Sequence, residues 1–202
     1  MLNLYFVRHG QTEWNTENRF QGRKDSNLTE KGIDQAKRLG ERLKDFEWTA
    51  IYSSPSNRTM KTVEIVKGNC PLSIQQDERL MEMHLGDWEG MTQDEIKEMN
   101  GMQHDYFWNQ PSKYQNDKGE SFADVKERIE GFINEILQKY DSGNILITTH
   151  GVVIKTVQLI GSQLGMDELW KTPYIEGTSV TKMIIKDNKI EFEIEGDITH
   201  LD

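Results

Sequence analysis

Apolar and polar positions along this chain follow two different periods, and the changes between them predict where strands and helices lie. Four short runs rich in aliphatic and aromatic residues are typical of buried strands, because apolar residues follow one another without a polar face. These runs are residues 2–7, 50–53, 72–75 and 145–149. Two more runs, 180–185 and 190–194, flank the polar residues 186–189 and predict a hairpin.

Between the strand runs, apolar residues recur every three or four positions, which is the spacing of one face of an α-helix. The predicted helices span about 30–44, which Thr29 would cap, a stretch after Ser56, and 152–160. A longer helix is predicted after Ser121, with a broad apolar stripe that indicates a buried face. The stripe consists of Phe122, Val125, Ile129, Phe132, Ile133, Ile136, Leu137 and Tyr140.

Two stretches lack such a pattern. Residues 16–28 are polar and are predicted to form a loop. In residues 91–119, Thr92 and Glu95 have the spacing of a capping box, which predicts a short helix. We interpret this second segment as a small helical insertion over the functional site. The alternation of strands and helices elsewhere predicts an α/β fold, a three-layer αβα sandwich around a mostly parallel sheet, built as one domain over 1–202.

Composition narrows the possible functions of this domain. The 202 residues contain 34 acidic and 24 basic side chains, a formal net charge of −10, which argues against nucleic acid or an anionic membrane as partner. Cys70 is the one cysteine and cannot form an internal disulfide, and the chain starts on a strand without a leader sequence. No run approaches the roughly 20 apolar residues of a membrane span. We therefore expect a cytoplasmic protein.

Candidate chemistry stands where the predicted parallel strands end. The carboxyl ends of such strands meet at one edge of the sheet, where ligands bind, and right-handed crossovers bring them to the same side. Gly10 follows the first of these ends and is expected to let a ligand approach the backbone. The other residues after the four runs are, in chain order, Arg8 with His9, Arg58, Glu82, and His150 with Gly151.

Two guanidinium groups, two imidazoles and a carboxylate in one pocket suit a phosphoryl group. Arginine makes planar bidentate contacts to phosphate oxygens, and the helix after Gly151 offers free N–H groups to an anion. No metal site is predicted, because the histidines lack ligand spacing and there is no cysteine pair. The three histidines outside the pocket, expected to be surface or structural residues, are His84, His104 and His200.

Other reaction classes lack their motifs in this sequence. There is no Walker-type Gly-Lys-Ser/Thr and no G-x-G-x-x-G after a strand, which argues against P-loop enzymes and dehydrogenases. No serine lies in a G-x-S-x-G elbow, which argues against a serine hydrolase.

The same residues carry a resemblance to a known family. The chain resembles the histidine phosphatase superfamily, in its phosphoglycerate mutase-like branch, over nearly its whole length. Several motifs in the expected order make a chance match improbable. They are Arg8-His9-Gly10 continuing to Asn15, Asn18 to Gly22, Ser53-Ser54-Pro55 with Arg58-Thr59, Leu80-Met81-Glu82, Gly86 to Gly90, Gly119-Glu120-Ser121, and Thr149-His150-Gly151.

The resemblance implies a role for each site residue. His9 would be the nucleophile that becomes a phosphohistidine, and Glu82 the proton donor and acceptor. Glu13 is a rival acid because it lies near His9 in the sequence, but the resemblance favours Glu82. Burial would raise the pKa of Glu82 and the arginines would lower it, and the sequence leaves that balance open. Arg8, Arg58 and His150 would hold the phosphoryl oxygens, and Asn15, Gln21, Gly22 and Gly151 would complete the phosphate pocket. Neither a metal nor another cofactor is implied.

Three functions fit this pocket. The leading hypothesis is a phosphatase that passes the phosphoryl group from His9 to water, and the second is a phosphoglycerate mutase that returns it to a reoriented intermediate. The segment between Glu82 and Ser121 is shorter than in the mutases, and 80–90 looks more like the phosphatases, which favours the first. A non-catalytic phospho-ligand-binding module would be expected to have lost His9 or an arginine, and neither is lost.

The substrate is expected to be a small phosphorylated metabolite. Tyr106, Phe107 and Trp108 stand among polar residues of the insertion, where they would either contact the organic part of the substrate or pack the insertion onto the core. We expect broad, modest activity on small phosphomonoesters without dependence on a bisphosphoglycerate cofactor.

Overall fold

The computed structural model describes residues 1–187 and 189–202, within which six strands form one sheet in the order β3-β2-β4-β1-β5-β6. The strands are β1 (Leu2–Arg8), β2 (Ala50–Ser53), β3 (Ile74–Gln76), β4 (Gly143–Thr149), β5 (Val180–Lys186) and β6 (Lys189–Asp197). The first four are parallel, whereas β5 is antiparallel to β1 and to β6. The mostly parallel sheet and the closing hairpin are confirmed. Asn188, in the predicted turn, lies outside the described residues.

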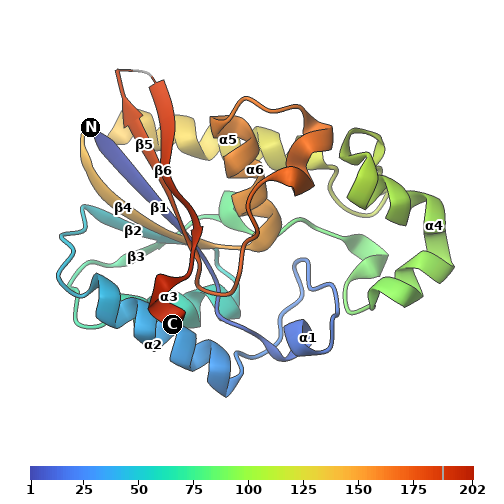
Figure 1. Cartoon of the computed structure of the whole chain (residues 1–202), viewed down its shortest axis with the longest axis horizontal. Coiled ribbons are helices and arrows are strands. Elements are labelled where there is room, and N and C mark those ends of the chain that lie inside the picture. The colour runs from blue at the N-terminus through green and yellow to red at the C-terminus, as the bar shows by residue number, and fades with distance from the viewer. Residues whose placement is uncertain (188) are drawn as a thin grey trace.

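Helices cover both faces of the sheet, which confirms the three-layer sandwich (Figure 1). On one face lie α2 (Glu30–Leu43) and α3 (Asn57–Lys67), and on the other α5 (Phe122–Lys139) and α6 (Gly151–Gly161). Side chains of β1 pack against the helices on both faces of the sheet, because successive side chains of a strand point to opposite faces. Tyr5 and Val7 pack in the cluster of α2 and α3, whereas Leu4 and Phe6 pack in that of α5 and α6. Burial on both faces explains the continuous apolar runs.

Side-chain caps define where several helices begin. Thr29 accepts a hydrogen bond from the Gly32 N–H at 3.0 Å at the start of α2. Ser121 forms a capping box with Asp124 before α5. Thr92 forms one with Glu95 before α4 (Gln93–Asn109). These three predicted starts are confirmed, because short hydroxyl side chains satisfy the N–H groups that a first helical turn leaves free.

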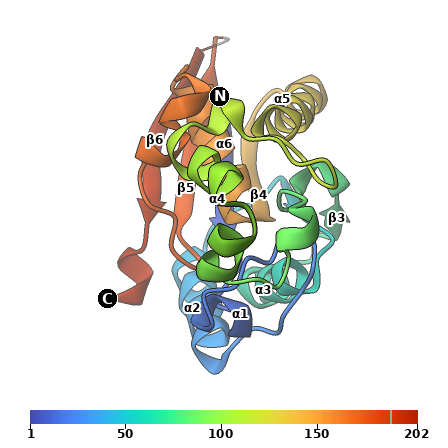
Figure 2. The same ribbon diagram turned by 90° about the vertical axis from the view of Figure 1, so that its right-hand side faces the viewer.

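The insertion is more helical than predicted. Helix α4 continues to Asn109, and the non-helical backbone of Asn100, with φ −153° and ψ 76°, divides it into two segments. It lies beyond the carboxyl ends of the parallel strands, where it faces the viewer in Figure 2. The remaining short helices are α1 (Glu13–Thr16) and the 3₁₀ turns η1 (Glu78–Leu80), η2 (Gly86–Trp88), η3 (Pro111–Lys113), η4 (Met166–Lys171) and η5 (Thr199–Leu201).

Two local predictions were wrong. Strand β3 begins at Ile74 rather than at residue 72. Leu137 is 39% exposed, although Ile136 beside it is buried, because the apolar stripe of α5 is wider than the face that the sheet covers. In the described part of the chain, no helix is both long and apolar enough to cross a membrane.

Candidate functional site

One cavity of about 650 Å³ lies at the carboxyl edge of the parallel strands. Residues of α4, among them Gln93 and Trp108, line it together with the strand-end residues, so the insertion covers the site as predicted. Eight of the nine predicted site residues line this cavity, and His150 is the exception. The eight are Arg8, His9, Asn15, Gln21, Gly22, Arg58, Glu82 and Gly151.

His9 follows β1 and is held by its own backbone. Its N–H donates to the Thr149 carbonyl of β4 at 3.0 Å, which continues the pairing of the two strands. Its Nδ1 lies 2.8 Å from the Gly10 carbonyl, which can only accept, so Nδ1 carries the proton. The lone pair is therefore on Nε2. Burial lowers the pKa of His9 well below its usual value, and Arg58 and Arg8 lower it further. The imidazole is neutral at pH 7.

Gly10 does not have the predicted role. A Cβ at this position would collide with the backbone of Gly32 in α2. The missing side chain therefore allows the turn after β1 to pack against α2, rather than allowing a ligand to approach. The close approach keeps His9 seated at the end of its strand.

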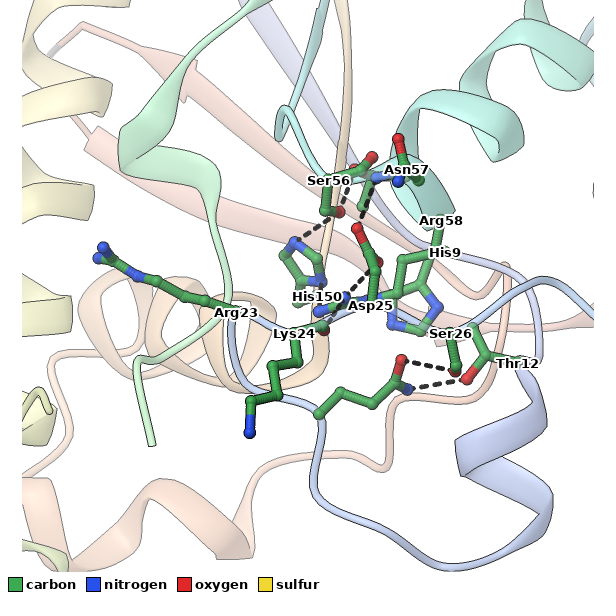
Figure 3. A network of polar contacts seen from close by, with 12 residues as sticks. His9, Thr12, Arg23, Lys24, Asp25, Ser26, Ser56, Asn57, Arg58 and His150 are labelled. Atoms are coloured by element: carbon green, nitrogen blue, oxygen red, sulfur yellow. Dashed lines mark hydrogen bonds and ion pairs between the residues drawn. The ribbon is translucent and has the colours of Figure 1, made fainter. Parts of the chain in front are cut away.

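Arg58 lies in the first turn of α3 and is almost fully buried, with 2% of its surface exposed. It donates to the carbonyls of Gly22 at 2.8 Å and Lys24 at 2.7 Å, and pairs with Asp25 at 2.5 Å (Figure 3). Three contacts to one loop fix the guanidinium plane. They also attach the loop of 17–28 to the site.

The Nε–H groups of both arginines are buried donors without a hydrogen-bond partner in the described residues. Arg8 uses Nη1 to donate to the Ile175 carbonyl at 2.7 Å, which orients its side chain. Buried donors are normally paired, and those left free beside a cavity mark a place for a ligand with acceptor atoms. Two such donors on cations suit the oxygens of a phosphoryl group.

His150 stands behind Arg58 rather than in the cavity wall. Its Nδ1 lies 3.0 Å from Arg58 Nη2, which can only donate, so Nδ1 is the acceptor and Nε2 carries the proton. The Nε2–H donates a hydrogen bond to Ser54 Oγ at 2.8 Å. Burial and then Arg58 lower the pKa of His150 well below its usual value. Both ring nitrogens are engaged, and the ring centroid lies 5.4 Å from that of His9.

Glu82 reaches the cavity from beyond η1 rather than from the end of a strand. Its carboxylate accepts from the backbone N–H of Met83 at 3.0 Å and of Val152, in the first turn of α6, at 3.3 Å. Burial raises the pKa of Glu82, and it outweighs these hydrogen bonds and the charges of Arg58 and Arg8. The balance that the sequence left open therefore favours the protonated acid.

Gly151 lies between Glu82 and Arg8. A Cβ here would be 3.8 Å from Arg8 Nε and 3.9 Å from Glu82 Oε2. The rival acid Glu13 is exposed on α1 and does not line the cavity.

Hydrogen bonds connect residues of the loop of 17–28 with one another and with α1. Gln21 donates to Thr12 Oγ1 at 2.8 Å and accepts from Ser26 Oγ at 3.1 Å, so its side chain organises the loop (Figure 3). Asn15 accepts from Thr12 within the capping box of α1. Gly22 has φ +55°, a conformation that favours glycine, and turns its carbonyl to Arg58.

The aromatic residues of the insertion divide between the two predicted roles. Phe107 is buried in the core and also lines the cavity, next to Trp108. Trp108 packs on Trp170, with 4.6 Å between ring centroids. Tyr106 packs against the core and does not line the cavity.

Sequence reasoning missed several residues of the site. Asp25 pairs with Arg58, and Ser54 accepts a hydrogen bond from His150. Glu89 accepts from the backbone N–H of Arg23 at 3.0 Å and of Leu85 at 3.1 Å. Ser54 and Glu89 stood within motifs named in the sequence analysis, and the sequence offered no distinct signal for Asp25. None of His84, His104 and His200 lines the cavity. Within the described residues, no group of three or more His, Cys, Asp or Glu side chains could hold a metal ion.

Comparisons with known proteins show which family and which solved structures the chain is similar to. Residues 4–197 match the family model described as histidine phosphatase superfamily (branch 1). A Salmonella arizonae protein named "Probable phosphoglycerate mutase GpmB" is 31% identical, over 100% of this chain and 96% of that protein. Phosphoserine phosphatase 1 of Hydrogenobacter thermophilus is 30% identical, over 84% of this chain and 81% of that protein. The solved structure of Bacillus stearothermophilus YhfR is 45% identical, with a TM-score of 0.97 and full coverage of both chains.

Proposed function

The chain belongs to the histidine phosphatase superfamily, and from this premise we propose that it is a phosphomonoester phosphatase that acts through a phosphohistidine at His9. The observation that carries the proposal is the tautomer of His9. Its Nδ1–H is bound to Gly10, which leaves the Nε2 lone pair for attack beside two arginines with free buried donors. A phosphatase-named relative, phosphoserine phosphatase 1, supports the same reaction class.

In the first half-reaction, Nε2 of neutral His9 attacks the phosphorus of the substrate. The phosphorus–oxygen bond to the organic group breaks, and the leaving oxygen takes the proton of Glu82. The raised pKa of Glu82 extends the pH range over which that proton is present. Arg8 and Arg58 stabilise the charge on the three equatorial oxygens during transfer.

In the second half-reaction, the Glu82 carboxylate takes a proton from water while the water oxygen attacks the phosphohistidine. The phosphorus–nitrogen bond breaks, and its electron pair returns to Nε2. Inorganic phosphate leaves, and Glu82 is protonated again. One carboxyl group therefore serves both steps, and each step conserves protons.

The proposal requires no metal ion, because two guanidinium groups provide the positive charge at the phosphoryl group. His150 contributes by holding Arg58 in the free protein, and a bound phosphoryl oxygen can compete for the same donor. We propose a small phosphorylated metabolite as substrate and the cytoplasm as location. Trp108, Trp170 and Phe107 would contact the organic part of the substrate and tolerate several shapes, which favours broad specificity.

Phosphoglycerate mutase activity is the second candidate, and the relative named as a mutase is the observation in its favour. A mutase would retain the phosphohistidine until a reoriented product takes the group back. The two functions separate in one assay of phosphate release from sugar phosphates, phosphoglycerates, nucleotides and aryl phosphates, run beside conversion of 3- to 2-phosphoglycerate. Isomerisation that outruns phosphate release by orders of magnitude would establish the mutase.

The intermediate is tested by brief incubation with a ³²P-labelled phosphomonoester. We expect acid-labile, base-stable label on the wild-type protein and none on His9→Ala. We also expect excess chelator to leave the turnover of the wild type unchanged. His84→Ala is the matched control, because His84 is 40% exposed and lies outside the cavity wall. Label that persists in His9→Ala would refute the nucleophile, and activity lost to chelator and restored by a divalent ion would refute the metal-free mechanism.

A further inference from the structure

The cavity wall contains more positive charge than the phosphoryl pocket uses. Four cationic side chains line it together with the carboxyl groups of Glu82 and Glu176, and ion pairs within the protein neutralise two of the cations. These two ion pairs are Arg19 with Glu17 at 2.7 Å and Arg58 with Asp25 at 2.5 Å. Arg8 and Lys155 form no ion pair with any residue that the structure describes. Because Arg8 belongs to the phosphoryl pocket, Lys155 remains without an assigned function.

Lys155 lies one turn after the residues that approach the phosphoryl pocket. Gly151, Val152 and Lys155 are spaced to share one face of α6, and all three line the cavity. The ammonium donates to the carbonyls of Thr172 at 2.6 Å and Pro173 at 2.8 Å. An ammonium has three donors, and the third has no acceptor in the described part of the chain. Lys155 thus lines the cavity and keeps one donor without a partner among the described residues.

The charge of Lys155 costs free energy at this position, because the side chain is buried. The side chain is 6% exposed, and burial lowers its pKa to about 8, with the carboxylate of Glu195 on β6 acting in the opposite direction. At pH 7 the amine is still mostly protonated. A buried cation that has only carbonyl partners gains most from an anionic ligand, because opposite charges attract strongly away from water.

We infer that Lys155 binds a carboxylate of the substrate, so that the preferred substrates are phosphomonoesters that also carry a carboxylate. The inference rests on the proposed function, because it requires the phosphoryl group to lie between Arg8 and Arg58. One free N–H on a point charge suits a single carboxylate oxygen, whereas the arginines suit the phosphoryl group. A cavity of about 650 Å³ has room for both groups and a short carbon chain.

A matched pair of ligands tests the inference without turnover. D-3-phosphoglycerate and glycerol 3-phosphate have the same size, and only the first carries a carboxylate. Their dissociation constants are measured by calorimetry on the full-length His9→Ala variant, which cannot form the phosphohistidine. We expect D-3-phosphoglycerate to bind about tenfold more tightly at pH 7, as a charge-assisted hydrogen bond would give. The ratio should fall as the pH rises past about 8, where Lys155 loses its proton.

Substitution separates recognition from a purely structural role. Adding Lys155→Gln to His9→Ala should abolish the ratio while glycerol 3-phosphate binding changes less than about twofold. Lys171→Gln, in exposed η4, is the control and should leave the ratio unchanged. A parallel loss for both ligands would mean that Lys155 only anchors Thr172 and Pro173, and this would overturn the inference. The pH series on the unsubstituted lysine decides the case if the variant unfolds.

Two other outcomes are distinguishable. Equal binding of the two ligands at pH 7 would overturn the carboxylate inference and leave the phosphatase proposal intact. Failure of both ligands to bind would contradict the phosphoryl pocket, and the inference would fall with it.

Discussion

Arg58 Nη2 donates to Nδ1 of His150 at 3.0 Å, and this contact joins the first turn of α3 to the start of α6. The arginine can only donate, so the contact also decides which nitrogen of His150 carries the proton. The Nε2–H of His150 donates to Ser54 Oγ at 2.8 Å. The contacts from Ser54 through His150 to Arg58 therefore orient a guanidinium group whose own buried Nε–H has no hydrogen-bond partner among the described residues.

Ser54→Ala should lower kcat/KM by about fivefold, because the loss of one neutral hydrogen bond weakens the orientation of His150. His150→Ala should have a larger effect, since Arg58 then loses its partner. The measurement is steady-state kinetics on one alkyl phosphate, with far-UV circular dichroism to verify folding. If Ser54→Ala matches the wild type while His150→Ala is impaired, Ser54 does not act through His150.

Asp25→Asn should lower the free energy of unfolding by about 1–3 kcal/mol, because it leaves the buried Arg58 cation with less compensation. Asp34→Asn is the matched control, because the pair of Asp34 and Arg38 is exposed and should contribute less than about 0.5 kcal/mol. Urea denaturation measures both variants. Equal changes in the free energy of unfolding would show that the burial of Arg58 does not strengthen the contribution of its ion pair to stability.

Glu82→Gln should impair substrates with poor leaving groups most. We expect kcat/KM to fall by about 10²–10⁴-fold for glycerol phosphate and much less for p-nitrophenyl phosphate, whose leaving group departs without a proton. In the wild type, kcat/KM for glycerol phosphate should fall as the pH rises through the raised pKa of Glu82, because the acid form is lost. Equal losses for both substrates would remove Glu82 from the role of proton donor.

Stability should show the raised pKa of Glu82 directly. A carboxyl group whose pKa is higher in the folded state stabilises the fold fully below its unfolded pKa, and this contribution is lost as the pH rises through the folded pKa. The free energy of unfolding of the wild type should therefore fall relative to that of Glu82→Gln as the pH rises from 4 toward 7. The variant thus becomes more stable relative to the wild type. Urea denaturation at several pH values measures this trend.

The exposed Glu13→Gln variant provides the baseline for this series, since Glu13 lies outside the cavity wall. A difference between Glu82→Gln and the wild type that stays constant with pH would contradict the raised pKa.

The sequence by itself determined the layers of the fold and most of the site's composition. Continuous apolar runs predicted the parallel strands, and the caps at Thr29, Thr92 and Ser121 predicted where helices begin, because both signals are local. The positions of Arg8 and His9 at a strand end followed from the same local pattern. Topology rules were sufficient to bring distant strand ends to one edge of the sheet.

Only the tertiary structure decided how those side chains act on one another. The distances between atoms decide which nitrogen of His9 carries the proton and place His150 behind Arg58. They also leave the third donor of Lys155 without an acceptor in the described part of the chain. The same holds for the raised pKa of Glu82, where burial had to be weighed against two arginines. Burial and hydrogen bonding arise between segments far apart in the chain, and no local pattern encodes their distances. The exposure of Leu137 has the same origin, because periodicity gives the direction of an apolar face and packing decides its width.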